Sequence, residues 1–83
     1  MRLDKFLKVS RLIKRRTVAK QIADQGRILI NQKIAKSSSS VVVGDQLTLK
    51  FGNRLVTVKV VSLNENAKKN EANELYQIIE EKS

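Results

Sequence analysis

Arginine and lysine side chains gather in the first part of this chain, at spacings that could bind the phosphates of a nucleic acid. Residues 1–36 hold eleven of them against two carboxylates, whereas residues 37–83 hold six basic and six acidic residues. The whole formal net charge of +9 therefore lies in the first 36 residues. An excess of one sign on one part of a small protein indicates a polyanionic partner that meets one face of it.

The types of cation suggest which of them fix the position of that partner. A guanidinium group binds phosphate through two parallel hydrogen bonds, whereas an ammonium group acts as a point charge. We therefore expect Arg2, Arg11, Arg15 and Arg16 to set the register, and Asp4 to be a structural residue that orients neighbouring cations. The full set of candidate nucleic-acid-binding residues is Arg2, Lys5, Lys8, Arg11, Lys14, Arg15, Arg16, Thr17, Lys20, Arg27, Lys33 and Lys36.

Other kinds of chemistry find little support in the composition. The chain has no cysteine and no histidine, so it lacks thiolate ligands and the commonest general base. Its carboxylates are few and dispersed, and no glycine-rich phosphate loop is present. With three aromatic residues, Phe6, Phe51 and Tyr76, it has almost no rings on which bases could stack. We expect no enzyme, no metal site, no cofactor and no small-molecule substrate.

Two helices must position the basic residues. Leu3, Phe6, Leu7 and Ser10 follow helical spacing and predict a helix over about 3–10. The same spacing places the cations at positions 2, 5 and 8 on the other side of that helix. A basic connector over 11–16 leads to the second helix.

The second helix is expected from Thr17, as its N-cap, to about Gln25, with Gly26 as a left-handed stop. Val18 and Ile22 would pack it against the first helix. Both basic sets would then face one phosphate-lined surface. Thr17 is expected to act first as a cap and second as a phosphate ligand.

The remainder of the chain reads mainly as short strands. Strand or turn patterns occupy 27–30, 31–32, 33–35, 41–43, 46–51 and 56–61. Ala72, Leu75, Tyr76 and Ile79 lie at helical spacing, so we predict a terminal helix over about 71–81, with a strand over 76–79 as the alternative. The pattern predicts one α+β domain over 1–83.

Several spaced elements of the first half resemble the S4 RNA-binding domain. They are Arg2-Leu3-Asp4-Lys5-Phe6-Leu7, Ser10-Arg11, Arg15-Arg16-Thr17-Val18-Ala19-Lys20, Gln25-Gly26-Arg27-Ile28, Asn31, Lys36 and Val43-Gly44-Asp45. The resemblance covers about residues 1–50, with 51–83 as a strand and helix extension. It implies an S4 fold with the alpha-L motif, in which two N-terminal helices pack on a small bent antiparallel sheet and RNA binds the basic helical side.

The chain is most similar to stand-alone, heat-shock-type S4 proteins, and among them to the branch that acts in ribosome-associated quality control. The run from Leu7 to Arg16, Phe51-Gly52 and Glu74-Leu75-Tyr76 carry this closer likeness. It implies a cytoplasmic protein that binds large ribosomal subunits carrying peptidyl-tRNA, through ribosomal RNA and tRNA. It also implies a NEMF-type partner that adds an alanine tail to the stalled chain. A heat-shock-type subunit-recycling or ribosome assembly factor is the alternative.

Two further classes of binding protein compete with this interpretation. A basic amphipathic helix can bind an anionic membrane surface, but the apolar stripes here are narrow and are needed for the core. No apolar run approaches the ~20 residues that span a bilayer, so we expect a soluble protein with no membrane partner. The two helices could also be a DNA-binding helix-turn-helix, although the connector over 11–16 is longer and more basic than the usual turn of that motif.

Overall fold

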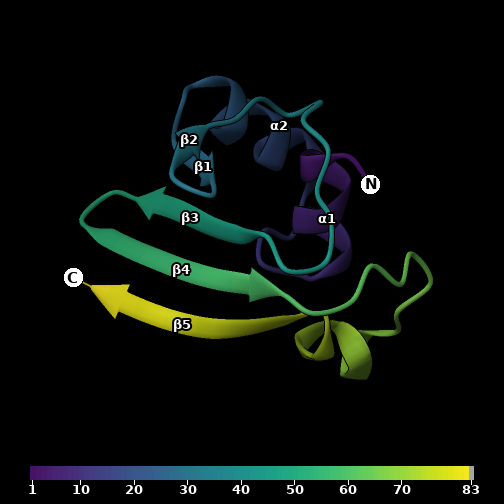
Figure 1. The fold of residues 1–83 in the computed structure, drawn as a ribbon. Helices are drawn as coiled ribbons and strands as arrows, with labels where there is room; N and C mark the ends of the chain where they lie inside the picture. The colour runs from purple at the N-terminus through teal and green to yellow at the C-terminus, as the bar shows by residue number, and fades with distance from the viewer. Residues whose placement is uncertain (83) are drawn as a thin grey trace.

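Two short helices lie on the same side of a five-stranded antiparallel sheet in the computed structural model, which describes residues 1–82 (Figure 1). The helices are α1 (Leu3–Val9) and α2 (Arg16–Asp24). The strands are β1 (Ile28–Ile30), β2 (Lys33–Ile34), β3 (Gln46–Phe51), β4 (Arg54–Val60) and β5 (Tyr76–Lys82), in the spatial order β2-β1-β3-β4-β5. The α+β architecture expected from the sequence is confirmed.

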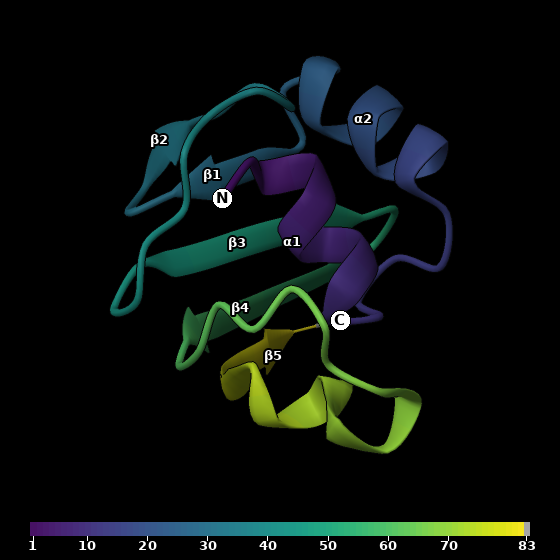
Figure 2. The ribbon, with the colours of Figure 1, turned by 90° about the vertical axis from the view of Figure 1, so that its right-hand side faces the viewer.

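The first helix forms where the apolar spacing predicted it. Leu3, Phe6 and Leu7 are fully buried, and α1 lies across β3 (Figure 2). Asp4 lies in the first turn and Lys8 in the last, so both charges suit the helix dipole. Apolar spacing and terminal charges therefore favour the same helix.

The second helix begins two residues earlier than predicted. Arg15, in an extended conformation, is the N-cap, and no side chain caps the helix; the prediction that Thr17 is the N-cap was wrong. The carbonyl of Arg15 instead accepts the N–H of Ala19 at 3.0 Å. The predicted stop is correct, since Gly26 has a φ of +78° just after the helix.

The face of α2 that packs inward also differs from the prediction. Ala19 and Ala23 are fully buried, whereas Val18 is 37% exposed; the predicted packing is confirmed only for Ile22, which is partly buried against the core. Arg16, Ala19 and Ala23 are spaced i, i+3 and i+7, so one face carries all three. The rotation that buries the two alanines thus also brings Arg16 to α1. Small side chains on this face allow the two helices to approach closely.

The sheet begins with a tight hairpin between β1 and β2. Asn31 and Gln32 both have positive φ, at 51° and 71°, as a two-residue hairpin turn requires. The Asn31 side chain ties this turn to β3, because its carbonyl oxygen accepts the N–H of Gln46 at 3.0 Å. The turn predicted at 31–32 is confirmed.

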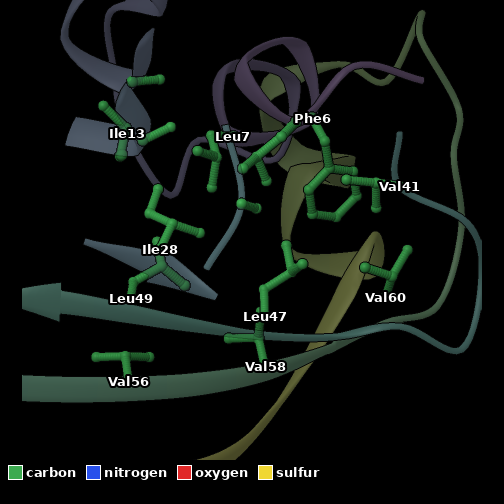
Figure 3. Packing of buried hydrophobic residues seen from close by; sticks show 14 of the residues in the cluster. Phe6, Leu7, Ile13, Ile28, Val41, Leu47, Leu49, Val56, Val58 and Val60 are labelled. Carbon is green, nitrogen blue, oxygen red and sulfur yellow. The ribbon is translucent and has the colours of Figure 1, made fainter. Parts of the chain in front are cut away.

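Alternation along β3 and β4 divides the sheet into a core face and an outer face. Leu47 and Leu49 of β3 lie opposite Val58 and Val56 of β4, and all four are buried. Phe6 and Leu7 of α1 reach down toward them (Figure 3). Residues 46, 48, 50, 57 and 59 alternate with these core positions and are partly or fully exposed. The core therefore fills the space between α1 and this face.

The prediction of a C-terminal helix over 71–81 was wrong, since the described residues contain no such helix. A 3₁₀ helix, η1 (Lys69–Glu74), leads into β5, which pairs antiparallel with β4. Pairing gives partners to the N–H and C=O groups along β4 that would otherwise lack them. Ile78 and Ile79 are β-branched and suit a strand. The alternative strand over 76–79 is confirmed and extends to Lys82.

The strand expected at 41–43 does not form either. Val41 is fully buried and its N–H donates to the carbonyl of Met1 at 2.8 Å. The next residue turns away, because the Val42 N–H donates to the Asp45 carboxylate at 2.9 Å. Contacts with the N-terminus and with the turn at Gly44-Asp45 therefore replace a strand ladder.

Candidate nucleic-acid interface

The buried carboxylate of Asp4 joins the beginnings of the two helices. Asp4 is only 3% exposed. It accepts hydrogen bonds from Arg2 Nε at 3.2 Å and Nη2 at 3.4 Å, and from Arg16 Nη2 at 3.3 Å. Arg2 is the N-cap of α1 and Arg16 is the first residue of α2. One carboxylate therefore fixes two guanidinium groups from helices that are separated along the chain.

The arrangement leaves both arginines available to a further anion. Their side chains are about half exposed, at 50% for Arg2 and 47% for Arg16. Arg16 gives Asp4 only one of its N–H groups, and Arg2 gives only its Nε and Nη2 atoms. Two positive charges face one negative charge, so a net positive charge and several N–H donors remain directed to solvent.

The ionisation of Asp4 depends on these two partners. Burial alone disfavours the charged carboxylate, but the hydrogen bonds from Arg2 and Arg16, together with their positive charges, outweigh it and lower the pKa of Asp4. The group is therefore a carboxylate throughout the neutral range.

We expect the stability of the protein to fall in acid partly because Asp4 becomes protonated. Since its pKa is lower in the folded than in the unfolded chain, its contribution is complete above the unfolded value of about 3.9. The contribution is lost as the pH falls through the folded value. Urea unfolding of the native chain and of Asp4→Asn, from pH 7 to pH 2, measures this. The native chain should be more stable at pH 7, and the difference should shrink below about pH 4. A difference independent of pH would contradict the assignment.

The other predicted cations lie along the same helices and on the hairpin beyond them. Lys5 and Lys8 follow Arg2 at three-residue intervals on α1, and Lys20 lies one turn after Arg16 on α2. Within residues 1–82, only Arg2, Lys5 and Arg16 among the cations of the first half pair with a carboxylate. The cations without such a partner are Lys8, Arg11, Lys14, Arg15, Lys20, Arg27, Lys33 and Lys36.

Lys5 pairs with an acid from the loop between β4 and η1. Its Nζ lies 2.6 Å from Glu65 Oε1, and that contact lowers the pKa of Glu65. This segment also contributes Leu63 and Ala67 to the rim of the core. Residues of the neutral second half therefore border the basic helices.

The connector between the helices is anchored by two buried side chains. Ser10 and Ile13 are buried, and the Ser10 hydroxyl donates to the carbonyl of Leu7 at 3.3 Å. Arg11, with a φ of 60°, reverses the chain and is exposed. The buried anchors thus leave Arg11, Lys14 and Arg15 directed to solvent.

A loop that the basic pattern did not single out holds the start of α1. The N–H of Leu3 donates to the carbonyl of Ser39 at 2.8 Å, and the N–H of Asp4 to the carbonyl of Ser37 at 3.2 Å. Ser37 is itself bound by Asp24 at the end of α2. The sequence contained one signal for this contact, a carboxylate at a helix C-terminus, where the dipole disfavours it.

Thr17 and Lys20 line a shallow groove on the exposed side of α2, with Gln21, Asp24 and Gln25. All five residues come from one helix, so the groove is a stripe of helix surface and not an enclosed pocket.

Within residues 1–82, no cluster of three carboxylate, histidine or cysteine side chains could hold a metal ion. No helix in that part of the chain has the length and apolar character to cross a membrane.

Comparison with known families and proteins identifies the architecture. The model of the S4 domain matches residues 1–47, which include both helices, the β1–β2 hairpin and the first residues of β3. The chain belongs to the S4 domain family. The matched range also contains Asp4 and its two guanidinium partners, Arg2 and Arg16.

Relatives of this S4 protein extend the similarity beyond the matched range. The RQC P-site tRNA stabilizing factor of Bacillus subtilis is 63% identical over 98% of this chain and 94% of its own length. The protein of the same name from Streptococcus pneumoniae is 56% identical over 98% and 92%. The Heat shock protein 15 homolog of Haemophilus influenzae is 37% identical, over 93% of this chain and 60% of its own length.

The S4 fold is also found in a solved structure. The trimeric structure of Vibrio cholerae Heat Shock Protein 15 is similar with a TM-score of 0.87 and 32% identity, covering 95% of this chain and 81% of that one. The expected S4 fold, with two N-terminal helices on an antiparallel sheet, is therefore confirmed, and its C-terminal element is η1 followed by β5.

Proposed function

We propose that this S4 protein is a non-catalytic RNA-binding factor that stabilises tRNA in the P site of large ribosomal subunits during ribosome-associated quality control. The observation that carries the proposal is 63% identity over 98% of the chain to a protein named for that role. Arg2 and Arg16, joined at Asp4 on the basic half, supply a surface suited to phosphates.

The proposed mechanism is recognition of RNA shape through its backbone. The Asp4 carboxylate holds the two guanidinium groups in fixed positions before RNA arrives, so less side-chain entropy is lost on binding. Lys5, Lys8 and Lys20 extend the positive surface along the helices. Arg27, Lys33 and Lys36 extend it along the hairpin, and Arg11, Lys14, Arg15 and Thr17 complete the set. Few rings are available for stacking, which supports backbone contacts over base contacts.

The partners we propose are ribosomal RNA of the large subunit, peptidyl-tRNA and a NEMF-type quality-control factor that docks on the neutral second half, all in the cytoplasm. Residues 1–83 would act as one domain, with the S4 core in 1–50 and the strand-rich extension after it. A subunit-recycling role is the second candidate, supported by the similarity to the Heat shock protein 15 homolog. The chain spans only 60% of that relative, so we favour the first role.

Sedimentation of a tagged protein in bacterial lysate tests the proposal. The native chain should migrate with large subunits that carry peptidyl-tRNA, because RNA there supplies the phosphates. Arg2→Ala combined with Arg16→Ala should move it to the top of the gradient. Lys50→Ala combined with Lys59→Ala removes the same charge from the outer face of the sheet and should leave it on the subunits. A native chain that stays at the top at low salt would overturn the proposal.

A further inference from the structure

The serine run at 37–40 acts as a support for the beginning of α1. The first N–H groups of a helix have no partner within it. Here two of them donate to the carbonyls of Ser39 and Ser37. Arg2, the residue before the helix, pairs with Ser40 in a single antiparallel bridge. The position of the loop therefore determines where Arg2 and Asp4 lie.

Asp24, the last residue of α2, holds this loop with both carboxylate oxygens. Its Oδ1 accepts the backbone N–H of Ser37 at 3.0 Å, and its Oδ2 accepts the Ser37 hydroxyl at 3.2 Å. Ser37 is 5% exposed, so the contact is sheltered on the serine side. The backbone hydrogen bond from Ser37, then that from its hydroxyl, lower the pKa of Asp24.

The negative charge of Asp24 is unfavourable at its position, both for the helix and for the binding of an anion. A negative charge at a helix C-terminus opposes the dipole. It also reduces the positive potential of the half that would meet RNA, where the only other acid is Asp4. Each of the two acids in residues 1–36 instead makes hydrogen bonds that fix one end of a helix.

The contacts form a closed ring through both helices. Asp24 binds Ser37, the Ser37 carbonyl accepts the N–H of Asp4, and the Asp4 carboxylate binds Arg16 at the other end of α2. We propose that Asp24 is a positioning residue for RNA binding, which fixes Arg2 and Arg16 relative to each other through the serine loop. This inference rests on the proposed function, since it concerns the same phosphate-binding surface.

Removal of the Asp24 charge distinguishes a positioning role from a purely electrostatic one, because the two roles predict opposite changes in affinity. If Asp24 were only a nearby negative charge, Asp24→Ala would tighten binding to an anionic partner. Positioning predicts the opposite, about tenfold weaker binding to purified bacterial large ribosomal subunits. Asp24→Asn removes the same charge but keeps an oxygen that accepts from Ser37, so its affinity should stay within about twofold of the native value.

Two further measurements make the test specific. Affinity for RNA falls as salt rises, and the steepness of log affinity against log salt should decrease by about one for Asp24→Ala, because one phosphate contact is lost. A variant that merely unfolds in part would lose affinity with an unchanged slope. Glu65→Gln is the matched control, since it removes an acid that pairs with the Lys5 side chain but takes no part in the ring of contacts, and it should bind as tightly as the native chain or tighter.

The outcomes distinguish the inference from the function on which it rests. Weaker binding and a lower slope for Asp24→Ala, with recovery in Asp24→Asn, support the inference. If Asp24→Ala does not fold, Ser37→Ala replaces it, with about threefold weaker binding and a lower slope expected. A folded Asp24→Ala that binds as tightly as the native chain overturns the inference alone. A native chain that does not bind the subunits overturns both.

Discussion

Replacement of Arg16 by alanine is expected to weaken binding to large ribosomal subunits by about tenfold to a hundredfold, more than the loss of any other single cation. Arg16 is the residue that joins α2 to the buried carboxylate on α1, and 47% of its side chain still faces solvent. Its removal deletes a guanidinium fork from the centre of the surface. It also leaves Asp4 with Arg2 as its one guanidinium partner within residues 1–82.

Lys33 provides the matched comparison for Arg16. It is an exposed cation of the same half, on the short edge strand β2, and within residues 1–82 no carboxylate pairs with it. Lys33→Ala should cost only about twofold in affinity, since it removes one point charge at the rim. Arg16→Lys keeps the charge and loses the fork, so an intermediate loss is expected. Equal losses for Arg16→Ala and Lys33→Ala in a binding titration would contradict the central place of Arg16.

The parts of this fold that the sequence predicted are those governed by local rules. The spacing of Leu3, Phe6 and Leu7 predicted α1, and the alternation of residues 56–60 predicted β4. Gly26 marked the end of α2, and Asn31-Gln32 marked the hairpin turn. The charge asymmetry identified the half of the chain in which Asp4, Arg2 and Arg16 meet. Local pattern and composition therefore indicated the elements and the general location of the candidate surface.

The features that the sequence predicted wrongly or missed share a different cause, since each depends on contacts between residues that are distant along the chain. Residues 76–82 have apolar residues at helical spacing, but the open edge of β4 makes a strand the better state. Val18 is more apolar than Ala19, yet the Arg16–Asp4 contact and close helix packing select the alanine face. The contacts of Asp24 with Ser37 and of Lys5 with Glu65 span long separations that no local pattern encodes. These contacts decide how the cations are held.

Replacement of Phe6 by alanine is expected to have the largest effect on stability. Phe6 is the largest of the fully buried side chains, and it lies between α1 and the sheet, near Val41 and Leu47 (Figure 3). Truncation of a buried phenylalanine costs about 3–5 kcal/mol, because apolar area is lost and a cavity remains. Small domains are stable by only about 5–15 kcal/mol, so this loss is a large fraction of the total.

Thermal and urea unfolding of Phe6→Ala measure the effect directly. The melting temperature should fall by roughly 12 °C or more, since a domain of this size loses about 4–8 °C for each kcal/mol. Phe51→Ala is the matched control, because the same side chain is removed where it is only partly buried, at the end of β3. Its loss should be smaller, because part of the ring already faces water and its removal leaves no closed cavity. Phe6→Ala should bind large subunits normally at temperatures where it remains folded, since Phe6 lies beneath the basic surface and not on it. Equal destabilisation by the two variants would show that the space between α1 and β3 is not the centre of the core.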